Sequence, residues 1–155
     1  MSDAPLLRLR YKAAQNEMLP HLQVIEDEAY PEPWTTGMFR EEMRNQHSHF
    51  YCAYHDDALV GYAGFWLLLD DAHITTITTR LELRGQGYGR EQMQHLIERA
   101  REVNAQRMSL EVRPSNTAAR QMYTQFGFTE IGIRKEYYAK SREDALVLEL
   151  RFDTP

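Results

Sequence analysis

Arg84-Gly85-Gln86-Gly87-Tyr88-Gly89 is a glycine-rich segment that a helical pattern follows directly. The apolar residues after it fall at the spacing of one helix face: Met93, Leu96, Ile97, Ala100 and Val103. A flexible loop that leads into a helix presents unpaired backbone N–H groups, and the helix dipole favours negative charge beside them. This glycine loop, residues 84–89, therefore predicts a site for an anionic group such as the pyrophosphate of a large cofactor.

The composition is that of a globular protein. Of the 155 residues, 43% are hydrophobic and 26% are charged, which excludes a disordered or membrane-embedded chain. The longest apolar run, Phe65-Trp66-Leu67-Leu68-Leu69, is too short to span a bilayer, and the first residues lack a signal-peptide pattern. The single cysteine, Cys52, excludes an internal disulfide and is typical of a reducing compartment. We expect one domain, residues 1–155, in the cytoplasm.

The net charge indicates which kinds of molecule the protein could bind. At −5, the chain lacks the basic excess of a general nucleic-acid binder. A modest negative charge mostly serves solubility, and it is also compatible with a cationic substrate drawn to an acidic cleft. We therefore expect neither a nucleic-acid nor a membrane partner.

The spacing of apolar residues predicts alternating strands and helices. The expected order is a strand (6–11), a helix (17–28), a short helix after Thr35 or Thr36, strands (50–54, 59–69 and 73–79), the helix after the glycine loop, a strand (107–112), a helix (Ser115 or Asn116 to about 126), and strands (128–138 and 144–152). Pro31 and Pro33 interrupt the first helical stretch, and Gly127 is placed to end the last helix. A central mixed sheet covered by helices is the expected architecture.

Two nucleotide-binding interpretations of the glycine loop are disfavoured. No Gly-Lys-Ser/Thr follows it, so it is not a P-loop for a nucleoside triphosphate. Its Gly-x-Gly-x-Gly spacing differs from the Rossmann fingerprint, and no clean βαβ unit with a ribose-binding acid follows. A glycine-rich turn alone is weak evidence, because many such stretches are only tight turns.

Motifs later in the chain, taken together with the glycine loop, are more specific than the loop alone. The chain contains, in order, Arg84-x-x-Gly87-x-Gly89, Leu110-Glu111-Val112-Arg113-Pro114-Ser115-Asn116, Tyr123 and Gly127-Phe128. This combination resembles the GNAT superfamily of acetyl-CoA-dependent N-acetyltransferases, in which the glycine motif is the pyrophosphate loop. The motif around Glu111, with Tyr137-Tyr138 and Glu143-Asp144-Ala145, is similar to the ribosomal-protein alanine N-acetyltransferases within it. Those enzymes acetylate the N-terminal amine of a small-subunit ribosomal protein.

The resemblance implies a fold, a cofactor and its contacts. The implied fold is the α/β (α+β) GNAT fold, a central, mixed and mostly antiparallel sheet of about seven strands flanked by about four helices. The cofactor is acetyl-CoA, and the residues implied to bind it are Ile77, Thr78, Thr79, Arg84, Gly85, Gln86, Gly87, Tyr88, Gly89, Arg90 and Asn116. Thr78-Thr79-Arg80-Leu81 departs from the usual apolar Ala-Val and the following Asp-Pro. Backbone contacts to pantetheine tolerate this change. Asn116 is by default a helix cap, and the resemblance adds a bond to the cofactor.

The resemblance also assigns the acid and the base. Glu111 is implied to be the general base for direct attack by the amine, through water, and Tyr123 to be the general acid for the leaving thiolate. An α-amine with a pKa of about 7.7–8.0 needs only a modest base, whereas a lysine near 10.4 needs a stronger one. The residue types also allow purely structural roles, namely a Glu111–Arg113 pair on the strand surface and a Tyr123 ring packed with Ala119 and Phe126.

The residues that would bind the acetyl acceptor are the least clearly marked in the sequence. The resemblance implies that Tyr30, Pro31, Trp34, Tyr137 and Tyr138 bind the peptide, although aromatic residues at turns also serve as lids on a core. A lysine or small-amine acetyltransferase and a non-catalytic acyl-CoA-binding module remain alternatives.

Three further sequence features are expected to be structural. Glu26-Asp27-Glu28 is expected to be a solvated helix face. His47-x-His49 and Asp70-Asp71-x-His73 lack a convincing set of four metal ligands, so no metal is expected. Cys52 is expected to be a buried strand cysteine rather than a nucleophile.

Overall fold

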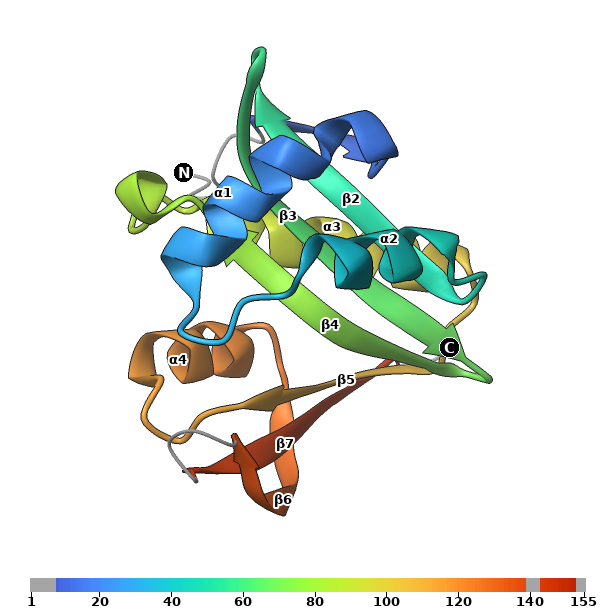
Figure 1. Ribbon diagram of the computed structural model, residues 1–155. Coiled ribbons are helices and arrows are strands. Elements are labelled where there is room, and N and C mark those ends of the chain that lie inside the picture. Colours follow the sequence, from blue (N-terminus) through green and yellow to red (C-terminus); the bar gives the residue numbers. More distant parts are fainter. Residues whose placement is uncertain (1–7, 139–142, 153–155) are drawn as a thin grey trace, which may run out of the picture. The chain divides into compact units, whose positions relative to one another are not determined.

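Seven strands and four α-helices make up the described residues, 8–138 and 143–152, of this computed structural model (Figure 1). In chain order the elements are β1 (Leu9–Ala13), a 3-10 turn (Asn16–Met18), α1 (Leu19–Ala29), α2 (Thr36–Arg44), β2 (Ser48–His55), β3 (Ala58–Leu68), β4 (Asp71–Thr79), a 3-10 turn (Leu81–Leu83), α3 (Tyr88–Glu102), β5 (Arg107–Val112), α4 (Thr117–Gln125), β6 (Thr129–Tyr138) and β7 (Glu143–Arg151). The order and type of the strands and α-helices agree with the sequence prediction, which did not include the two 3-10 turns. Residues 6 and 7 of the expected first strand lie outside the described residues.

The strands form one mixed sheet in the order β1-β2-β3-β4-β5-β7-β6. β4 and β5 are parallel, whereas β1–β2, β5–β7 and β6–β7 are antiparallel. The expected mixed and mostly antiparallel sheet is therefore confirmed. The chain divides into two compact units, residues 1–65 with 75–96 and residues 66–74 with 97–155. None of the helices in the described ranges is long and apolar enough to cross a membrane.

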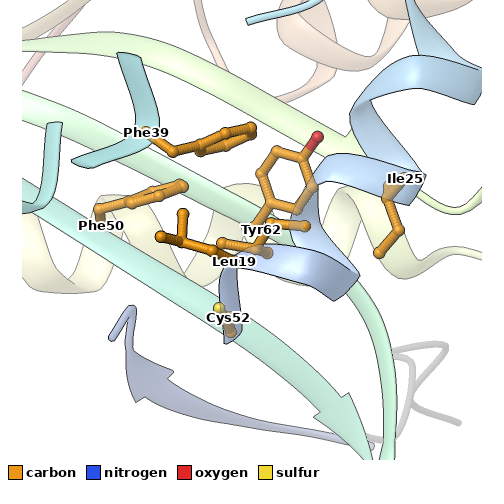
Figure 2. Close-up of a cluster of buried hydrophobic side chains, with 7 residues drawn as sticks. Leu19, Ile25, Phe39, Phe50, Cys52 and Tyr62 are labelled. Atoms are coloured by element: carbon orange, nitrogen blue, oxygen red, sulfur yellow. The ribbon is translucent and has the colours of Figure 1, made fainter. Parts of the chain in front are cut away.

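In the first unit, α1 and α2 lie on one face of the β2–β3 strands and the start of α3 lies on the other (Figure 1). Aromatic rings dominate the core between α1, α2 and the strands, as Figure 2 shows. The rings of Phe39 and Phe50 both meet Tyr62 edge to face, with centroids 5.8 and 6.0 Å apart. This geometry suits the aromatic quadrupole and adds to the burial of apolar area. Cys52 belongs to this core, where burial raises the pKa of its thiol to about 12, so its expected burial is confirmed.

Local side-chain signals set the helix ends. The Thr35 hydroxyl accepts a hydrogen bond from the Met38 N–H at 3.2 Å and caps α2. The Asn116 side chain accepts one from the Ala119 N–H at 3.2 Å and caps α4. Each cap satisfies an N–H group that a helix start leaves without a partner. Gly127 follows α4 with a φ of +100°, a left-handed conformation that favours glycine.

One expectation for the first unit was wrong. Glu26 is not part of a solvated face, because only 3% of it is exposed. Its carboxylate accepts hydrogen bonds from the Trp34 N–H at 2.9 Å and from the Tyr62 hydroxyl at 2.5 Å. Burial raises the pKa of Glu26, and the two hydrogen bonds act in the opposite direction. Glu26 thus ties the segment after α1 to the core, while Asp27 and Glu28 are exposed as expected.

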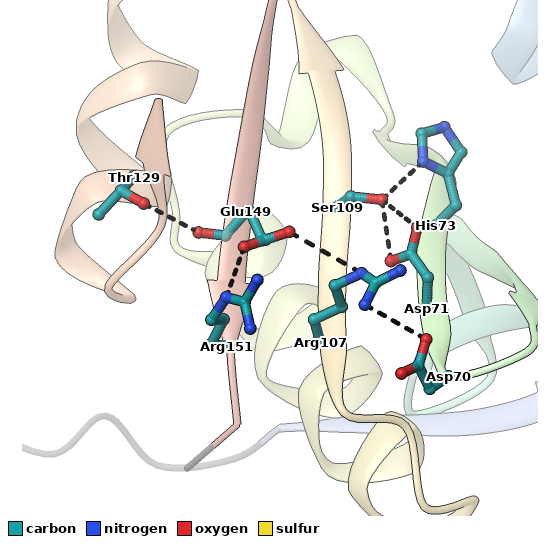
Figure 3. Close-up of polar contacts among 8 residues, drawn as sticks. All are labelled: Asp70, Asp71, His73, Arg107, Ser109, Thr129, Glu149 and Arg151. Carbon is teal, nitrogen blue, oxygen red and sulfur yellow. Dashed lines mark hydrogen bonds and ion pairs between the residues drawn. The ribbon is translucent and has the colours of Figure 1, made fainter. Parts of the chain in front are cut away.

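In the second unit, β5 lies between the first residues of β4 and the length of β7. Met108, Leu110 and Val112 of β5 are buried, and the strand's alternation puts Ser109 and Glu111 on the opposite face. The register pairs His73 with Ser109, and Ser109 with Glu149. Polar side chains from three neighbouring strands therefore share one face of this unit, which Figure 3 shows.

Candidate active site

The glycine loop of the first unit has a backbone that only glycine adopts readily. Gly85 and Gly87 have φ angles of +81° and +91°. A Cβ atom at Gly85 would have no neighbouring atom within 4 Å, so the backbone there is open. The Glu91 N–H closes the first turn of α3 onto the Gly87 carbonyl at 3.1 Å. The loop thus presents accessible backbone at a helix N-terminus, which is the arrangement that binds phosphate groups.

Arg8, the residue directly before β1, holds this loop, and the sequence prediction missed it. Its Nη2 donates to the Gln86 carbonyl oxygen at 2.7 Å, and its guanidinium lies 4.3 Å from the centre of the Tyr88 ring. Its Nε donates to Glu91 Oε2 at 2.8 Å, and its backbone N–H donates to Glu91 Oε1 at 2.7 Å. Glu91 is 4% exposed, so this ion pair is well shielded. No local motif marks Arg8, because its partners lie about 80 residues away in the chain.

The predicted cofactor strand, 77–79, is fixed by contacts within the first unit. Gln92 Nε2 donates to the Thr78 carbonyl oxygen at 3.1 Å and to Thr79 Oγ1 at 3.2 Å. The Tyr30 hydroxyl and Thr78 Oγ1 are 2.7 Å apart. Tyr30 is 36% exposed. This hydrogen bond connects it to Thr78, a residue that the resemblance assigned to cofactor binding. Burial raises the pKa of the Tyr30 hydroxyl, so Tyr30 remains a neutral phenol near neutral pH.

Trp34, the other predicted peptide residue of the first unit, has its ring on the core. The ring meets Phe39 edge to face at 5.3 Å between centroids. Its backbone N–H donates a hydrogen bond to the Glu26 carboxylate. Trp34 is thus partly buried as a lid on the core, which is the structural role that the sequence left open.

Glu111, the predicted base, is a shielded carboxylate of the second unit. Its side chain is 7% exposed and lies 2.9 Å from His73 Nε2 and 2.8 Å from Arg134 Nη1. The alternative pair with Arg113 is not what forms, because Arg113 lies beside Glu143 at 3.5 Å. Burial alone would raise the pKa of Glu111, but the hydrogen bonds and charges of His73 and Arg134 outweigh burial and lower it.

His73 extends this contact into a chain of hydrogen bonds. Its Nδ1 is 2.9 Å from Ser109 Oγ, and Ser109 Oγ donates to Asp71 at 2.9 and 3.0 Å, as Figure 3 shows. The hydrogen bond to Glu111 is the main reason that the pKa of His73 is raised; burial opposes it. The charges of Glu111 and Asp71 raise this pKa further, and Arg134 lowers it. Asp71 and His73, considered above as metal ligands, are thus engaged with Ser109 and Glu111.

These shifts predict a pH window of extra stability. The contribution of the His73 cation is present below its unfolded pKa of about 6.5 and is lost as the pH rises through the higher folded value. The contribution of Glu111 is present above its unfolded pKa of about 4.3 and is lost as the pH falls through the lower folded value. We expect His73→Gln to cost most stability between about pH 5 and 6, and less at about pH 8.5. Urea unfolding at both pH values measures the difference, and an equal cost at both would contradict it.

Tyr123, the predicted acid, lies on α4. Its ring is half-buried and packs against Phe128 at 5.8 Å between centroids. Asn116 begins the same helix as its cap. Tyr123 and Asn116 thus belong to one short helix that directly follows the strand carrying Glu111.

The remaining predicted peptide residues lie on β6. Tyr137 is 43% exposed, and the Arg134 guanidinium lies 4.5 Å from the centre of its ring. Burial and the nearby Glu111 raise the pKa of Tyr137, and Arg134 lowers it. Arg134 therefore links the exposed Tyr137 ring to the buried Glu111 carboxylate. The Tyr138 backbone pairs with Glu143, and its side chain lies outside the described residues.

No cluster of three or more His, Cys, Asp or Glu side chains suited to a metal ion is found among residues 8–138 and 143–152. In the second unit, Glu111 and His73 form a pair that can exchange a proton. In the first unit, the glycine loop offers a helix N-terminus that is open to an anion. Proton transfer and anion binding are both used in acyl transfer to an amine.

Comparison with known proteins agrees with this assignment. The model of the acetyltransferase (GNAT) family matches residues 19–128, and the chain belongs to this family. The resemblance described from sequence and the expected GNAT fold are both confirmed.

Two relatives and one solved structure have names that specify an acetyl acceptor. A Bacillus subtilis protein described as a putative [ribosomal protein bS18]-alanine N-acetyltransferase is 39% identical over 145 residues, which are 90% of this chain and 96% of that protein. The [ribosomal protein bS18]-alanine N-acetyltransferase of Escherichia coli K12 is 31% identical over 134 residues, 85% of this chain and 90% of that one. The crystal structure of the Escherichia coli ribosomal-protein-S18-alanine N-acetyltransferase superposes with a TM-score of 0.87 at 28% identity, covering 95% of this chain and 96% of that chain.

Proposed function

We propose that this protein transfers the acetyl group of acetyl-CoA to the N-terminal α-amine of ribosomal protein bS18, as one catalytic domain in the cytoplasm. The observation that carries the proposal is the shielded Glu111 carboxylate, held at 2.9 Å from His73 and 2.8 Å from Arg134 in a chain of the GNAT family. The names of relatives that align with nearly all of this chain support the choice of acceptor.

The glycine loop suits the pyrophosphate of acetyl-CoA. Gly85 and Gly87 are exposed and have positive φ angles that side chains rarely adopt, and the space around Gly85 is open. Arg84 and Arg90 bring positive charge to the two ends of the loop. In this proposal the residues that hold the cofactor are those of the loop and the strand before it, with Asn116: Ile77, Thr78, Thr79, Arg84, Gly85, Gln86, Gly87, Tyr88, Gly89, Arg90 and Asn116.

Arg8 provides a test of the loop that does not depend on catalysis. Arg8→Ala removes the bond to the Gln86 carbonyl and leaves the buried Glu91 without its cation, so the loop loses its fixed shape. We expect the dissociation constant for acetyl-CoA, measured by calorimetry, to rise about 10-fold. Arg10→Ala is the matched control, because Arg10 is an exposed arginine of β1, two residues after Arg8. It contacts the Asp56 carbonyl at 2.8 Å and the Asp57 carboxylate at 3.7 Å, both outside the loop. An equal weakening in both variants would contradict the role of Arg8.

The proposed chemistry needs a base, an acid and a held amine. Acetyl-CoA, when bound, supplies a thioester that an amine attacks directly. Glu111 accepts a proton from the substrate ammonium, directly or through water, and Tyr123 donates one to the leaving thiolate. Because an α-ammonium with a pKa of about 7.7–8.0 gives up its proton more easily than a lysine near 10.4, the arrangement favours an N-terminal acceptor.

The aromatic residues that the sequence resemblance assigns to the peptide are proposed to bind it. They are Tyr30, Trp34, Tyr137 and Tyr138. The exposed ring of Tyr137, held under Arg134, is the clearest such surface in the second unit. Large flat side chains grip a flexible peptide backbone at a low cost in side-chain entropy.

The proposed reaction is tested with defined peptides. The protein is mixed with acetyl-CoA and peptides that carry a free N-terminal alanine, a blocked N-terminus with an internal lysine, or both free groups. We expect mass spectrometry to place the acetyl group on the N-terminal nitrogen of the free peptides. Acetylation of lysine in the blocked peptide alone, or cofactor binding with no product from any peptide, would overturn the proposal.

A further inference from the structure

We propose that His73 is the proton-accepting partner of Glu111, so that the proton taken from the substrate ammonium comes to rest on His73 Nε2. This inference rests on the proposed function, in which Glu111 faces the amine. His73 acts through Glu111 and is therefore a positioning residue. The sequence marked His73 only as a candidate metal ligand, and its place beside Ser109 comes from the parallel register that sets β4 beside β5.

The hydrogen-bond chain fixes which ring nitrogen carries a proton. The Ser109 hydroxyl has one hydrogen, and it donates this hydrogen to the Asp71 carboxylate at 2.9–3.0 Å. Ser109 Oγ must then accept from His73, so Nδ1 is the protonated nitrogen at its 2.9 Å contact. Nε2 is left facing Glu111 Oε2 at 2.9 Å, and these two atoms form a site that binds one proton between them.

Glu111 alone is poorly matched to an α-amine. Burial raises the pKa of Glu111, but Arg134 and the protonated form of His73 outweigh burial and lower it. Even its ordinary value of about 4.3 lies more than three pH units below that of an α-ammonium, about 7.7–8.0. The imidazole has an ordinary pKa of about 6.5, and its contact with Glu111 raises this value toward that of the amine. A base works best when its pKa lies near that of the group it deprotonates and near the working pH.

The proton balance is complete without any other reactant. An N–H bond of the ammonium breaks and its electron pair stays on nitrogen. The proton bonds to a Glu111 oxygen, and this O–H bond breaks as the Nε2–H bond forms. The change from ammonium to amide releases two protons. His73 holds the first until solvent takes it. Tyr123 gives its hydroxyl proton to the leaving thiolate, and its oxygen regains a proton from the second N–H bond of the nitrogen as that bond breaks, directly or through water.

The charged groups that face His73 come from three strands. Asp71 lies on β4, Glu111 on β5 and Arg134 on β6. The two carboxylates favour the imidazolium and the guanidinium opposes it. Because neutral His73 is the form that can accept the proton, the rate of acetyl transfer should increase as the pH rises through the pKa of His73.

The direct test combines a titration with single-turnover kinetics. In imidazole-labelled protein, NMR should give His73 a pKa above about 6.5, and Glu111→Gln should lower it. His73→Gln keeps an N–H donor for Glu111 but does not titrate. We expect it to lower the single-turnover rate about 10- to 100-fold, to remove the rise with pH that tracks the wild-type His73 titration, and to leave the peptide KM within about twofold. His47→Gln, at an exposed histidine in the turn before β2, is the matched control and should behave as wild type.

The outcomes separate this inference from the proposed function. If His73→Gln keeps the wild-type rate and pH profile while Glu111→Gln is inactive, the inference is wrong and the base assignment stands. If Glu111→Gln also keeps the wild-type rate, the base assignment fails and the inference fails with it. Ser109→Ala, which removes the partner of Nδ1, gives a second variant: a wild-type NMR titration and pH profile in it would also overturn the proposed chain.

Discussion

Replacing Glu111 with Gln is expected to lower the rate of peptide acetylation about 10²- to 10⁴-fold near neutral pH. The amide fills the same space between His73 and Arg134 but has no basic oxygen. The deficit should be largest below the pKa of the substrate amine, because there the base must remove a proton before attack. Above about pH 9 the amine is already neutral, and the deficit should shrink. Initial rates from pH 6 to pH 9.5 measure both effects.

Two controls make this result specific to proton transfer. Acetyl-CoA affinity should stay within about twofold, because the variant changes no residue of the glycine loop. Glu149→Gln is the matched substitution, since Glu149 shares the face of β7 beside β5 and pairs with Arg107 at 3.8 Å and Arg151 at 2.9 Å. It should keep the wild-type rate within a few-fold. A wild-type rate for Glu111→Gln across the whole pH range would show that Glu111 is not the base.

Gly61→Ala is expected to have the largest effect on stability. A Cβ atom at Gly61 would lie 2.1 Å from the Thr78 carbonyl oxygen and 2.9 Å from Gln92 Nε2, both inside the first unit. The clash is with backbone, which cannot rotate away as a side chain can, and a shift of Thr78 would break its bond from Gln92. We expect a loss of about 3 kcal/mol or more in the free energy of unfolding, measured by urea denaturation.

Gly132 offers a matched strand glycine. A Cβ atom there would have no neighbour within 4 Å, so Gly132→Ala should change the free energy of unfolding by less than about 0.5 kcal/mol. If Gly61→Ala unfolds at the same urea concentration as wild type, the close approach of β3 to Thr78 is wrong. Because Thr78 also belongs to the predicted cofactor strand, any folded Gly61→Ala protein should bind acetyl-CoA more weakly.

Local signals explain why the elements could be predicted. Thr35 and Asn116 cap helices and Gly127 ends one, and each acts on residues within four positions in the chain. The glycine loop and the strand of Glu111 were found for the same reason, because short motifs mark them. Roles for the acetyl-CoA contacts and for Tyr123 came from resemblance and stay predictions.

Long-range contacts explain what the sequence did not yield. Arg8 acts on residues 78 and 83 positions away, and His73 meets Ser109 across 36 positions through the β4–β5 register. Periodicity assigns a side chain to a face but not to a partner on a distant element. The burial of Glu26, by contrast, could have been predicted from the sequence. Glu26 lies four positions after the buried Leu22, and residues four apart lie on the same face of a helix.

The most direct test of the account uses the proposed acceptor itself. Unmodified bS18 is incubated with this protein and acetyl-CoA, and mass spectrometry of the digested product locates the added group. The account predicts one acetyl group, on the N-terminal α-nitrogen of bS18, and none when Glu111→Gln replaces the wild-type protein over the same time near neutral pH. Acetylation confined to lysine side chains, or an unmodified bS18 N-terminus beside an acetylated unrelated amine, would contradict it.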